Sequence, residues 1–321
     1  MPPATGPNTP GPLVAVVGGG LAGMAAAARL AKMGHPVRLH EASDRLGGGW
    51  APYELPGPLP EGGRVLVDDA PGVLTFPAPW RDLFRKSGRP LEAELARSGR
   101  ELAPAPGATY RFADGTELVL PSDRGEQHQA LLHAYGPGAA ARWQLLLDSL
   151  GDVWQALRPL GLEEAYVASG VTRDVVRRVR GRRSLGDLAD SLDEPHLRAL
   201  VRSAAHRQGT TPEQAPALTA VELLVVRTFG RWQLGPAAGT PVPPASDDVG
   251  RTSVLVEALA ARLALRGVDV RLGSRVVAVE AGRAGVTGVR TSTGLEPAGA
   301  VVLAVDPWTA LELVPPTAAR G

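Results

Sequence analysis

The sequence has no cysteine, few aromatic residues and almost no net charge. The absence of cysteine excludes disulfide bonds, thiolate metal sites and a cysteine nucleophile, and it is compatible with a reducing cytoplasm. The net charge of +1 gives no general reason to expect a nucleic acid as partner. Aromatic residues make up only 4% of the chain, which leaves few side chains for an aromatic cage around a cation.

The sequence also lacks a long apolar run and a targeting segment. The longest uncharged stretch, residues 13–28, is broken by glycines, so no transmembrane helix is predicted and the expected location is the cytoplasm. Residues 1–12 are rich in proline and lack the basic start and apolar stretch of a signal peptide. They are predicted to form a disordered tail.

No set of residues for metal binding or nucleophilic catalysis is evident. His128 and His133 are five positions apart and do not share a helix face well, so no metal site is predicted. The sequence shows no Ser/His/Asp arrangement and no internal repeat, and we nominate no catalytic acid or base. Its 321 residues, 44% of them hydrophobic, are nevertheless enough for a buried core and two domains.

A strand, a turn, a helix, a second strand and an acid follow one another over residues 14–41. Residues 14–17 are apolar, as in a strand buried on both faces, and residues 37–40 form the neighbouring strand. The alanine-rich helix between them is expected to end at Gly34. This order predicts a dinucleotide-binding βαβ unit.

The turn of this unit carries Gly18, Gly20 and Gly23 in Gly-x-Gly-x-x-Gly spacing. Gly18 allows the tight turn, Gly20 lets the backbone approach a pyrophosphate, and Gly23 lets the helix pack closely against the sheet. The free N–H groups at the start of the helix, at Leu21 and Ala22, are then expected to face the phosphates.

Glu41 ends the second strand, where a carboxylate can accept hydrogen bonds from both ribose hydroxyls of an adenosine group. The same carboxylate would repel a 2′-phosphate. The acid therefore favours FAD or NAD over NADP.

Glu41 is followed by five residues and then by three glycines. Here the chain resembles the FAD-dependent oxidoreductases that include flavin amine oxidases, protoporphyrinogen oxidases and bacterial carotenoid (phytoene) desaturases. In that group Glu-x5-Gly-Gly-Arg wraps the FAD phosphates, so the resemblance implies that Glu41, Arg45, Gly47 and Gly48 bind FAD. Gly49 stands in place of the final arginine, and weaker FAD binding is expected because a charge-assisted contact is lost.

Three further features extend the resemblance. The segment YRFADGTELVLP, with a hairpin turn at Asp114 and Gly115, is typical of the carotenoid desaturase branch. Residues 68–72 partly match an Asp-x-Gly-Pro segment that lies near the flavin in that branch. Val276 corresponds to the valine whose backbone contacts the FAD adenine, and it also suits the core of a strand.

The resemblance implies an α/β fold, with a Rossmann-like FAD-binding domain of parallel sheet and antiparallel crossover plus an inserted, mainly helical cap domain for the substrate. The periodicity agrees, because it is helical over residues 122–231 and turns to strands after a helix at 253–265. The expected division is a tail at 1–12, the FAD-binding domain at 13–80 and 245–310, the cap at 81–244 and a tail at 311–321.

Members of the family continue beyond this point into a second substrate segment and a Gly-Asp turn whose aspartate binds FAD. The resemblance therefore leaves open whether the chain is a truncated form, a partial gene product or one piece of a split protein. In the last case a second chain would supply the missing segment.

The function implied by the resemblance is that of an FAD-dependent oxidoreductase of the phytoene desaturase type, which dehydrogenates or saturates carbon–carbon bonds of an apolar carotenoid or isoprenoid. A flavin amine oxidase is an alternative, although it would need aromatic residues beside the flavin. A non-catalytic nucleotide-binding fragment or subunit is a further alternative, which Gly49 and the short end of the chain favour.

Six arginines lie close together on the chain: Arg173, Arg177, Arg178, Arg180, Arg182 and Arg183. Such a run is most often the solvated face of a helix. It could instead contact anionic lipid headgroups, which would suit an enzyme that takes a lipid substrate from a membrane. Peripheral contact with the inner face of a membrane is therefore a second expectation.

Overall fold

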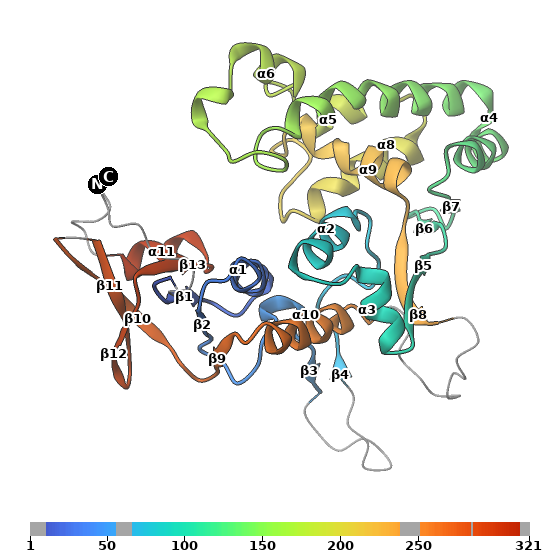
Figure 1. Cartoon of the computed structure of the whole chain (residues 1–321). Helices are drawn as coiled ribbons and strands as arrows, with labels where there is room; N and C mark the ends of the chain where they lie inside the picture. The colour runs from blue at the N-terminus through green and yellow to red at the C-terminus, as the bar shows by residue number, and fades with distance from the viewer. Residues whose placement is uncertain (1–10, 56–65, 238–250, 284, 315–321) are drawn as a thin grey trace. The chain divides into compact units, whose positions relative to one another are not determined.

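A computed structural model of the chain describes residues 11–55, 66–237, 251–283 and 285–314 (Figure 1). Residues 1–10 of the expected tail lie outside the described residues. Residues 56–65, in the segment rich in proline and glycine, also lie outside them. The chain divides into two compact units: unit 1 contains residues 1–103 and 233–321, and unit 2 contains residues 104–232. Residues 81–103 and 233–237, which were expected in the cap, group with unit 1.

Unit 1 contains the predicted parallel sheet, whose four strands follow the order β13-β1-β2-β9. These strands are β1 (Val14–Val17), β2 (Val37–His40), β9 (Asp269–Arg271) and β13 (Ala300–Leu303). All four residues of β1 are buried, as expected for the strand between two parallel neighbours. The α/β fold with a parallel sheet is confirmed.

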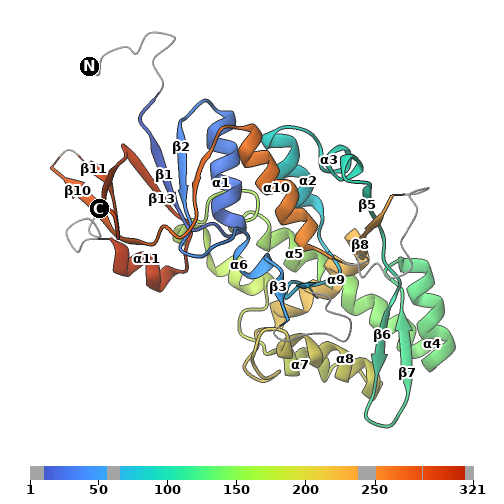
Figure 2. The same cartoon turned by 90° about the horizontal axis from the view of Figure 1, so that it is seen from below.

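Three helices of unit 1 lie side by side, as Figure 2 shows: α1 (Leu21–Lys32), α2 (Ala78–Ser87) and α10 (Ser253–Leu265). On α10 three leucines at four-residue spacing, Leu255, Leu259 and Leu263, are fully buried. α3 (Leu91–Arg97) follows α2 and is joined to α10 by an ion pair between Glu94 and Arg262. These contacts explain why α2 and α3 belong to unit 1.

The antiparallel crossover consists of β10 (Val276–Gly282), β11 (Gly285–Thr291) and β12 (Gly294–Pro297), and it stands between β9 and β13 in the chain. The helix α11 (Pro307–Leu313) packs on β10 and buries Leu313. The helix thus extends past residue 311, where a tail was expected, and its last residue is stabilised by burial.

The remaining elements of unit 1 are short. They are the 3₁₀ turn η1 (Gly48–Trp50), the paired strands β3 (Tyr53–Glu54) and β4 (Leu66–Val67), and the paired strands β5 (Arg100–Pro104) and β8 (Trp232–Pro236). The chain leaves unit 1 through β5 and returns through β8.

Unit 2 is mainly helical after a hairpin. The hairpin pairs β6 (Ala108–Arg111) with β7 (Glu117–Leu120), as the segment around Asp114 and Gly115 predicts. The helical elements are α4 (Arg124–Ser149), α5 (Gly151–Leu157), η2 (Ala168–Gly170), α6 (Arg173–Arg178), α7 (Leu185–Ala189), α8 (Pro195–His206), η3 (Ala217–Ala220) and α9 (Val221–Phe229).

The core of unit 2 is formed by its own helices and hairpin. At its centre Trp143 is 1% exposed, and its Nε1 donates a hydrogen bond to Oε1 of Gln127 at 2.9 Å. The long helix α4 is interrupted at Gly136, whose φ of 80° precedes Pro137. Within the parts of the chain that the structure describes, no helix is both long and apolar enough to span a bilayer.

Candidate nucleotide-binding site

The turn between β1 and α1 requires glycine at two of its three predicted positions. Gly18 has a φ of +102°, and a Cβ placed there would lie 2.5 Å from the carbonyl oxygen of Ala304. A Cβ on Gly23 would lie 1.8 Å from the carbonyl oxygen of Gly18. The absence of a side chain at both positions therefore allows the turn to pack against the residue after β13 and against the first turn of α1.

Gly20 differs from the other two, because a Cβ placed there would meet no atom of the protein within 4 Å. Gly20 is also the N-cap of α1, which has no side-chain cap and no acidic residue in its first turn. The backbone N–H groups of Leu21 and Ala22 precede the first intrahelical donor and are open to an anion. Open space therefore lies at the Cβ position of Gly20, at the N-terminus of α1.

Glu41 bridges the phosphate turn and the loop that follows β2. Its Oε2 accepts a hydrogen bond from the N–H of Gly19 at 2.6 Å, and its Oε1 accepts one from the N–H of Ser43 at 2.8 Å. Burial raises the pKa of Glu41, but the bonds from Ser43 and Gly19 together outweigh burial and lower the pKa below its ordinary value. The carboxylate is therefore held charged between the turn and the loop after β2.

The glycine pair after Glu41 packs against the backbone of the turn. The N–H of Gly47 donates to the carbonyl oxygen of Gly19 at 2.8 Å, and a Cβ on Gly48 would lie 3.2 Å from the Cα of Gly20. Both glycines have positive φ, +114° and +57°. The structure thus brings the two predicted glycine motifs into contact at one place.

Arg45 and Gly49 lie at the surface beside this pair. The guanidinium of Arg45 has no ion-pair partner among the described residues, so it is available to a ligand. A Cβ on Gly49 would meet nothing within 4 Å. The fold therefore has room for the arginine that the family carries at this position.

Val276 and Asp68 each have a structural role in the described fold. The side chain of Val276 is buried and packs with Ala15 and Val17 of β1. Oδ2 of Asp68 accepts a hydrogen bond from the N–H of Ser253, the first residue of α10, at 2.8 Å, which caps that helix. The aspartate at the partial match to the desaturase segment, Asp68, therefore stabilises the start of α10.

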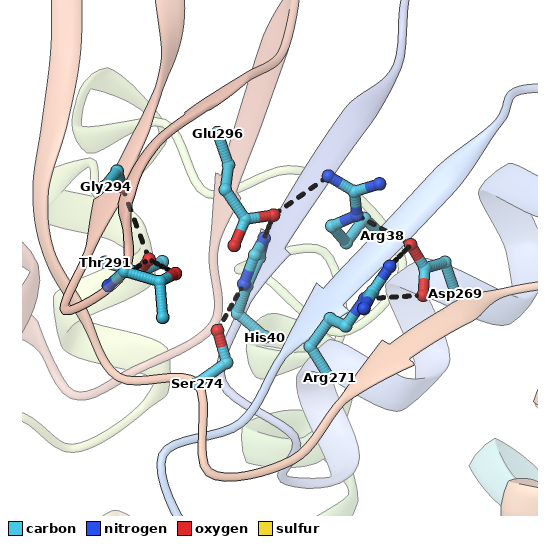
Figure 3. A network of polar contacts seen from close by, with 9 residues as sticks. Arg38, His40, Asp269, Arg271, Ser274, Thr291, Gly294 and Glu296 are labelled. Atoms are coloured by element: carbon cyan, nitrogen blue, oxygen red, sulfur yellow. Dashed lines mark hydrogen bonds and ion pairs between the residues drawn. The ribbon is translucent and has the colours of Figure 1, made fainter.

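A network of polar side chains supports the end of β2 just before Glu41 (Figure 3). His40 is 1% exposed and shares a hydrogen bond between its Nδ1 and Oγ of Ser274 at 2.9 Å. Its Nε2 lies 3.9 Å from Oε2 of Glu296. The N–H of Ser274 also donates to the carbonyl oxygen of Glu41 at 2.8 Å, so the loop before β10 holds both residues.

Arg38 extends this network on the same strand. Its Nε lies 2.7 Å from Oδ2 of Asp269 on β9, and its Nη1 lies 2.9 Å from Oε2 of Glu296 on β12. The two carboxylates hold the pKa of Arg38 above its usual range despite burial. Sequence analysis did not identify these residues, since Glu296 lies on a strand that was not predicted and is far from Arg38 in the chain.

The structure does not gather metal ligands in the described part of the chain: no group of three His, Asp or Glu side chains could hold a metal ion there. Each predicted nucleotide-binding residue before position 50 lies at or beside the turn between β1 and α1.

Comparison with known families decides the assignment. Residues 21–321 match the family of flavin-containing amine oxidoreductases. The chain belongs to this family. The cofactor that membership implies is a flavin, FAD, and the resemblance to FAD-dependent oxidoreductases is confirmed.

Individual relatives of this flavin-containing amine oxidoreductase are distant. A 4,4'-diapophytoene desaturase (4,4'-diaponeurosporene-forming) of Staphylococcus aureus is 24% identical over 223 residues, which are 68% of this chain and 42% of that protein. The chain thus spans less than half the length of this curated relative.

Solved structures show the same fold. An oxidoreductase from Methanosarcina mazei has a TM-score of 0.58 and 15% identity, covering 94% of this chain and 61% of that one. Cyclohexylamine oxidase from Brevibacterium oxydans has a TM-score of 0.56 and 19% identity, covering 96% of this chain and 62% of that one. At these identities the likeness concerns the fold alone.

Proposed function

We propose that the chain carries the nucleotide-binding part of an FAD-dependent oxidoreductase that dehydrogenates or saturates carbon–carbon bonds of an apolar carotenoid or isoprenoid. The observation that carries the FAD site is the contact between the turn at Gly18–Gly23 and the segment from Glu41 to Gly48. The similarity to a diapophytoene desaturase supports the class of substrate.

In this proposal the residues of the turn bind the phosphates of FAD. Gly20 gives the pyrophosphate access to the backbone, and the N–H groups of Leu21 and Ala22 donate to it. Arg45 adds a positive charge at the rim, and Glu41 accepts hydrogen bonds from the ribose. The backbone of Val276 contacts the adenine.

The flavin ring of bound FAD supplies the acceptor for a hydride from the substrate. The described residues of unit 1 bind and orient the adenosine half of that cofactor. Unit 2, with its own apolar core, is the candidate for the substrate cap. Desaturation of this kind requires no nucleophilic triad in the chain.

A flavin amine oxidase remains the alternative, because the family match is to amine oxidoreductases. The two enzymes differ in the bond that is oxidised: carbon–nitrogen in an amine and carbon–carbon in an isoprenoid. A non-catalytic nucleotide-binding fragment or subunit is the third candidate, which the exposed Gly49 favours.

The visible spectrum of the purified chain tests the FAD site. We expect flavin bands, either as purified or after addition of FAD, and a rise in melting temperature with FAD concentration. Glu41→Ala should weaken this binding, whereas Glu54→Ala, an exposed acid on β3, should leave it unchanged. A folded chain that stays colourless and takes up no FAD would exclude the proposal for this chain.

Chromatography of the products separates the enzyme classes. The FAD-loaded chain is incubated with an isoprenoid polyene precursor in one sample and with primary amines in another. Conversion of the isoprenoid supports the desaturase, and consumption of an amine supports the amine oxidase. FAD binding without either conversion favours the non-catalytic subunit.

A further inference from the structure

The six arginines of residues 173–183 do not share one helix face, contrary to the simplest expectation from the sequence. Only Arg173, Arg177 and Arg178 belong to α6, which ends at Arg178. Arg180 has a φ of +57°, and it is the one non-glycine residue with positive φ in the described parts of the chain. The chain therefore changes direction within the run.

This change of direction places two of the arginines on a groove of unit 2. The groove has a volume of about 440 Å³ and is lined by residues from α4, from the segment between α6 and α7, from α7 and from the residues after it. The lining residues are Arg142, Leu145, Leu146, Ser149, Arg180, Arg183, Leu188, Ser191 and Leu192. Three arginines and two serines thus line the groove together with four leucines, and no acidic residue does.

The contacts of the arginines hold them in place but leave most of their donors free. Nη2 of Arg180 donates to the Oγ of Ser149 at 2.8 Å and to its carbonyl oxygen at 3.2 Å. Nη2 of Arg183 donates to the carbonyl oxygen of Asp187 at 2.9 Å. Neither guanidinium has a carboxylate partner among the described residues, although each has five N–H donors.

Of the three arginines that line the groove, only Arg142 on α4 has an ion-pair partner among the residues that the structure describes. Its Nη2 lies 3.1 Å from Oδ2 of Asp193, and both side chains are largely exposed. An exposed pair of this kind is weak and exchanges readily with another anion. The lining of the groove therefore carries three positive charges, with Asp193, Asp152 and Asp187 nearby but not lining it.

The surroundings of Arg180 are unfavourable for an uncompensated charge. Burial lowers the pKa of Arg180, the nearby Arg183 lowers it further, and only Asp152 opposes them. The position after a short helix with positive φ is usually occupied by glycine, because a side chain there costs free energy. An arginine at this position is explained if its guanidinium binds an anion.

We propose that the groove lined by Arg142, Arg180 and Arg183 binds a phosphate group. Guanidinium groups match phosphate through paired, charge-assisted hydrogen bonds. The hydroxyls of Ser149 and Ser191 donate to the carbonyl oxygens of Leu146 and Leu188 instead, so the arginines supply the donors. Leu145, which is 69% exposed, can contact an apolar substituent of the same molecule. Such a phosphate can belong to a small anion or to a lipid headgroup, and the site does not depend on the proposed FAD chemistry.

The choice of variants separates binding from folding. Arg180→Gly removes the guanidinium and also relieves the backbone at a φ that favours glycine, so the fold should be retained. Arg182→Ala is the matched control, since Arg182 is an exposed arginine of the same run that does not line the groove. Arg142→Gln is a second test variant on another element.

Inorganic pyrophosphate is titrated by calorimetry at low salt into the full chain with FAD in excess, so that the proposed phosphate site at Gly20 is already occupied. Melting temperatures are recorded for each variant. We expect binding by the unchanged chain, a loss of affinity of at least about tenfold in Arg180→Gly and Arg142→Gln, and a change within about twofold in Arg182→Ala. Cosedimentation with vesicles of phosphatidylcholine, with and without phosphatidic acid, is measured on the same variants.

The two measurements distinguish the source of the phosphate. Pyrophosphate binding with this pattern of variants supports a small-anion site, and the same pattern with phosphatidic acid vesicles alone supports a lipid headgroup site. Absence of both kinds of binding overturns the proposal. Equal losses in Arg180→Gly and Arg182→Ala also overturn it, because they indicate diffuse attraction to the whole basic segment.

Discussion

At the scale of single residues, the glycines of the first turn divide into those that the fold needs and one that a ligand needs. Gly23→Ala should cost at least about 3 kcal/mol in free energy of unfolding, since its Cβ would lie 1.8 Å from the carbonyl oxygen of Gly18. Gly20→Ala should cost at most about 1 kcal/mol, the preference of a helix N-cap. The FAD affinity of the Gly20→Ala variant should nevertheless fall by at least about tenfold. Chemical denaturation and FAD titration check both, and equal losses of stability would contradict the distinction.

Gly49 gives a prediction in the opposite direction. Gly49→Arg restores the residue of the family at an exposed position where a Cβ meets nothing, so the fold should tolerate it. FAD affinity should rise by about tenfold through a charge-assisted contact with phosphate. Met33→Arg adds the same charge at the far end of α1 and serves as the control in the titration. An equal rise in both variants would indicate long-range attraction instead.

At the scale of elements, the end of β2 depends on a buried histidine. Burial lowers the pKa of His40 below its ordinary value of 6.5, and Arg38 and Arg271 lower it further, while Glu296 and Asp269 oppose them. Below pH 6.5 the unfolded chain therefore binds a proton that the folded chain does not. As the pH is lowered below 6.5, the free energy of unfolding should therefore decrease by up to about 1.4 kcal/mol per pH unit. The decrease should end once the folded state also binds the proton.

Replacing the histidine tests this dependence. His40→Asn keeps an amide near Ser274 but cannot be protonated, so the slope of unfolding free energy between about pH 5 and 6.5 should decrease. His206→Gln, at an exposed position on α8, is the control in the same denaturation series. A slope that His40→Asn leaves unchanged would show that other groups cause the dependence.

The attachment of α2 and α3 to α10 depends on a buried ion pair. Arg262 is 2% exposed, pairs with Glu94 and donates to the carbonyl oxygens of Phe84 at 3.2 Å and Arg89 at 3.3 Å. Arg262→Ala should cost about 3 kcal/mol because it leaves the buried Glu94 carboxylate with only its longer ion pair, to Arg89 at 3.5 Å. In a double-mutant cycle Arg262→Met with Glu94→Gln should recover part of that loss; strictly additive losses would contradict a coupled pair.

At the scale of the whole molecule, the two units have separate cores. The core of unit 2 is made only of residues between 104 and 232, so a fragment of these residues should unfold cooperatively with a helical circular dichroism spectrum. It should not bind FAD, because the predicted site lies in unit 1. A fragment that binds a hydrophobic dye and melts without a transition would show that its fold depends on unit 1.

Local motifs explain which parts of this architecture were predictable. The strands at 14–17 and 37–40, the hairpin around Asp114 and the helix at 253–265 follow from periodicity and turn residues that act over a few positions. β12 was missed because Gly294–Pro297 has no alternation of apolar residues and is stabilised by pairing with β11. The unit boundaries differ from expectation because α2 packs on α1, α3 packs on α2, and Arg262 of the distant α10 pairs with Glu94 of α3.

The sequence by itself determined the βαβ unit, the spacing of its glycines and the acid at position 41, since turn geometry and strand burial depend on neighbouring residues. Only the tertiary structure decided that Gly47 and Gly48 pack on the first turn, that Glu296 and Ser274 hold His40, and that two arginines of one run meet Arg142 on a groove. These contacts join residues far apart in the chain. Their formation depends on how packed elements bring side chains together, which no local pattern encodes.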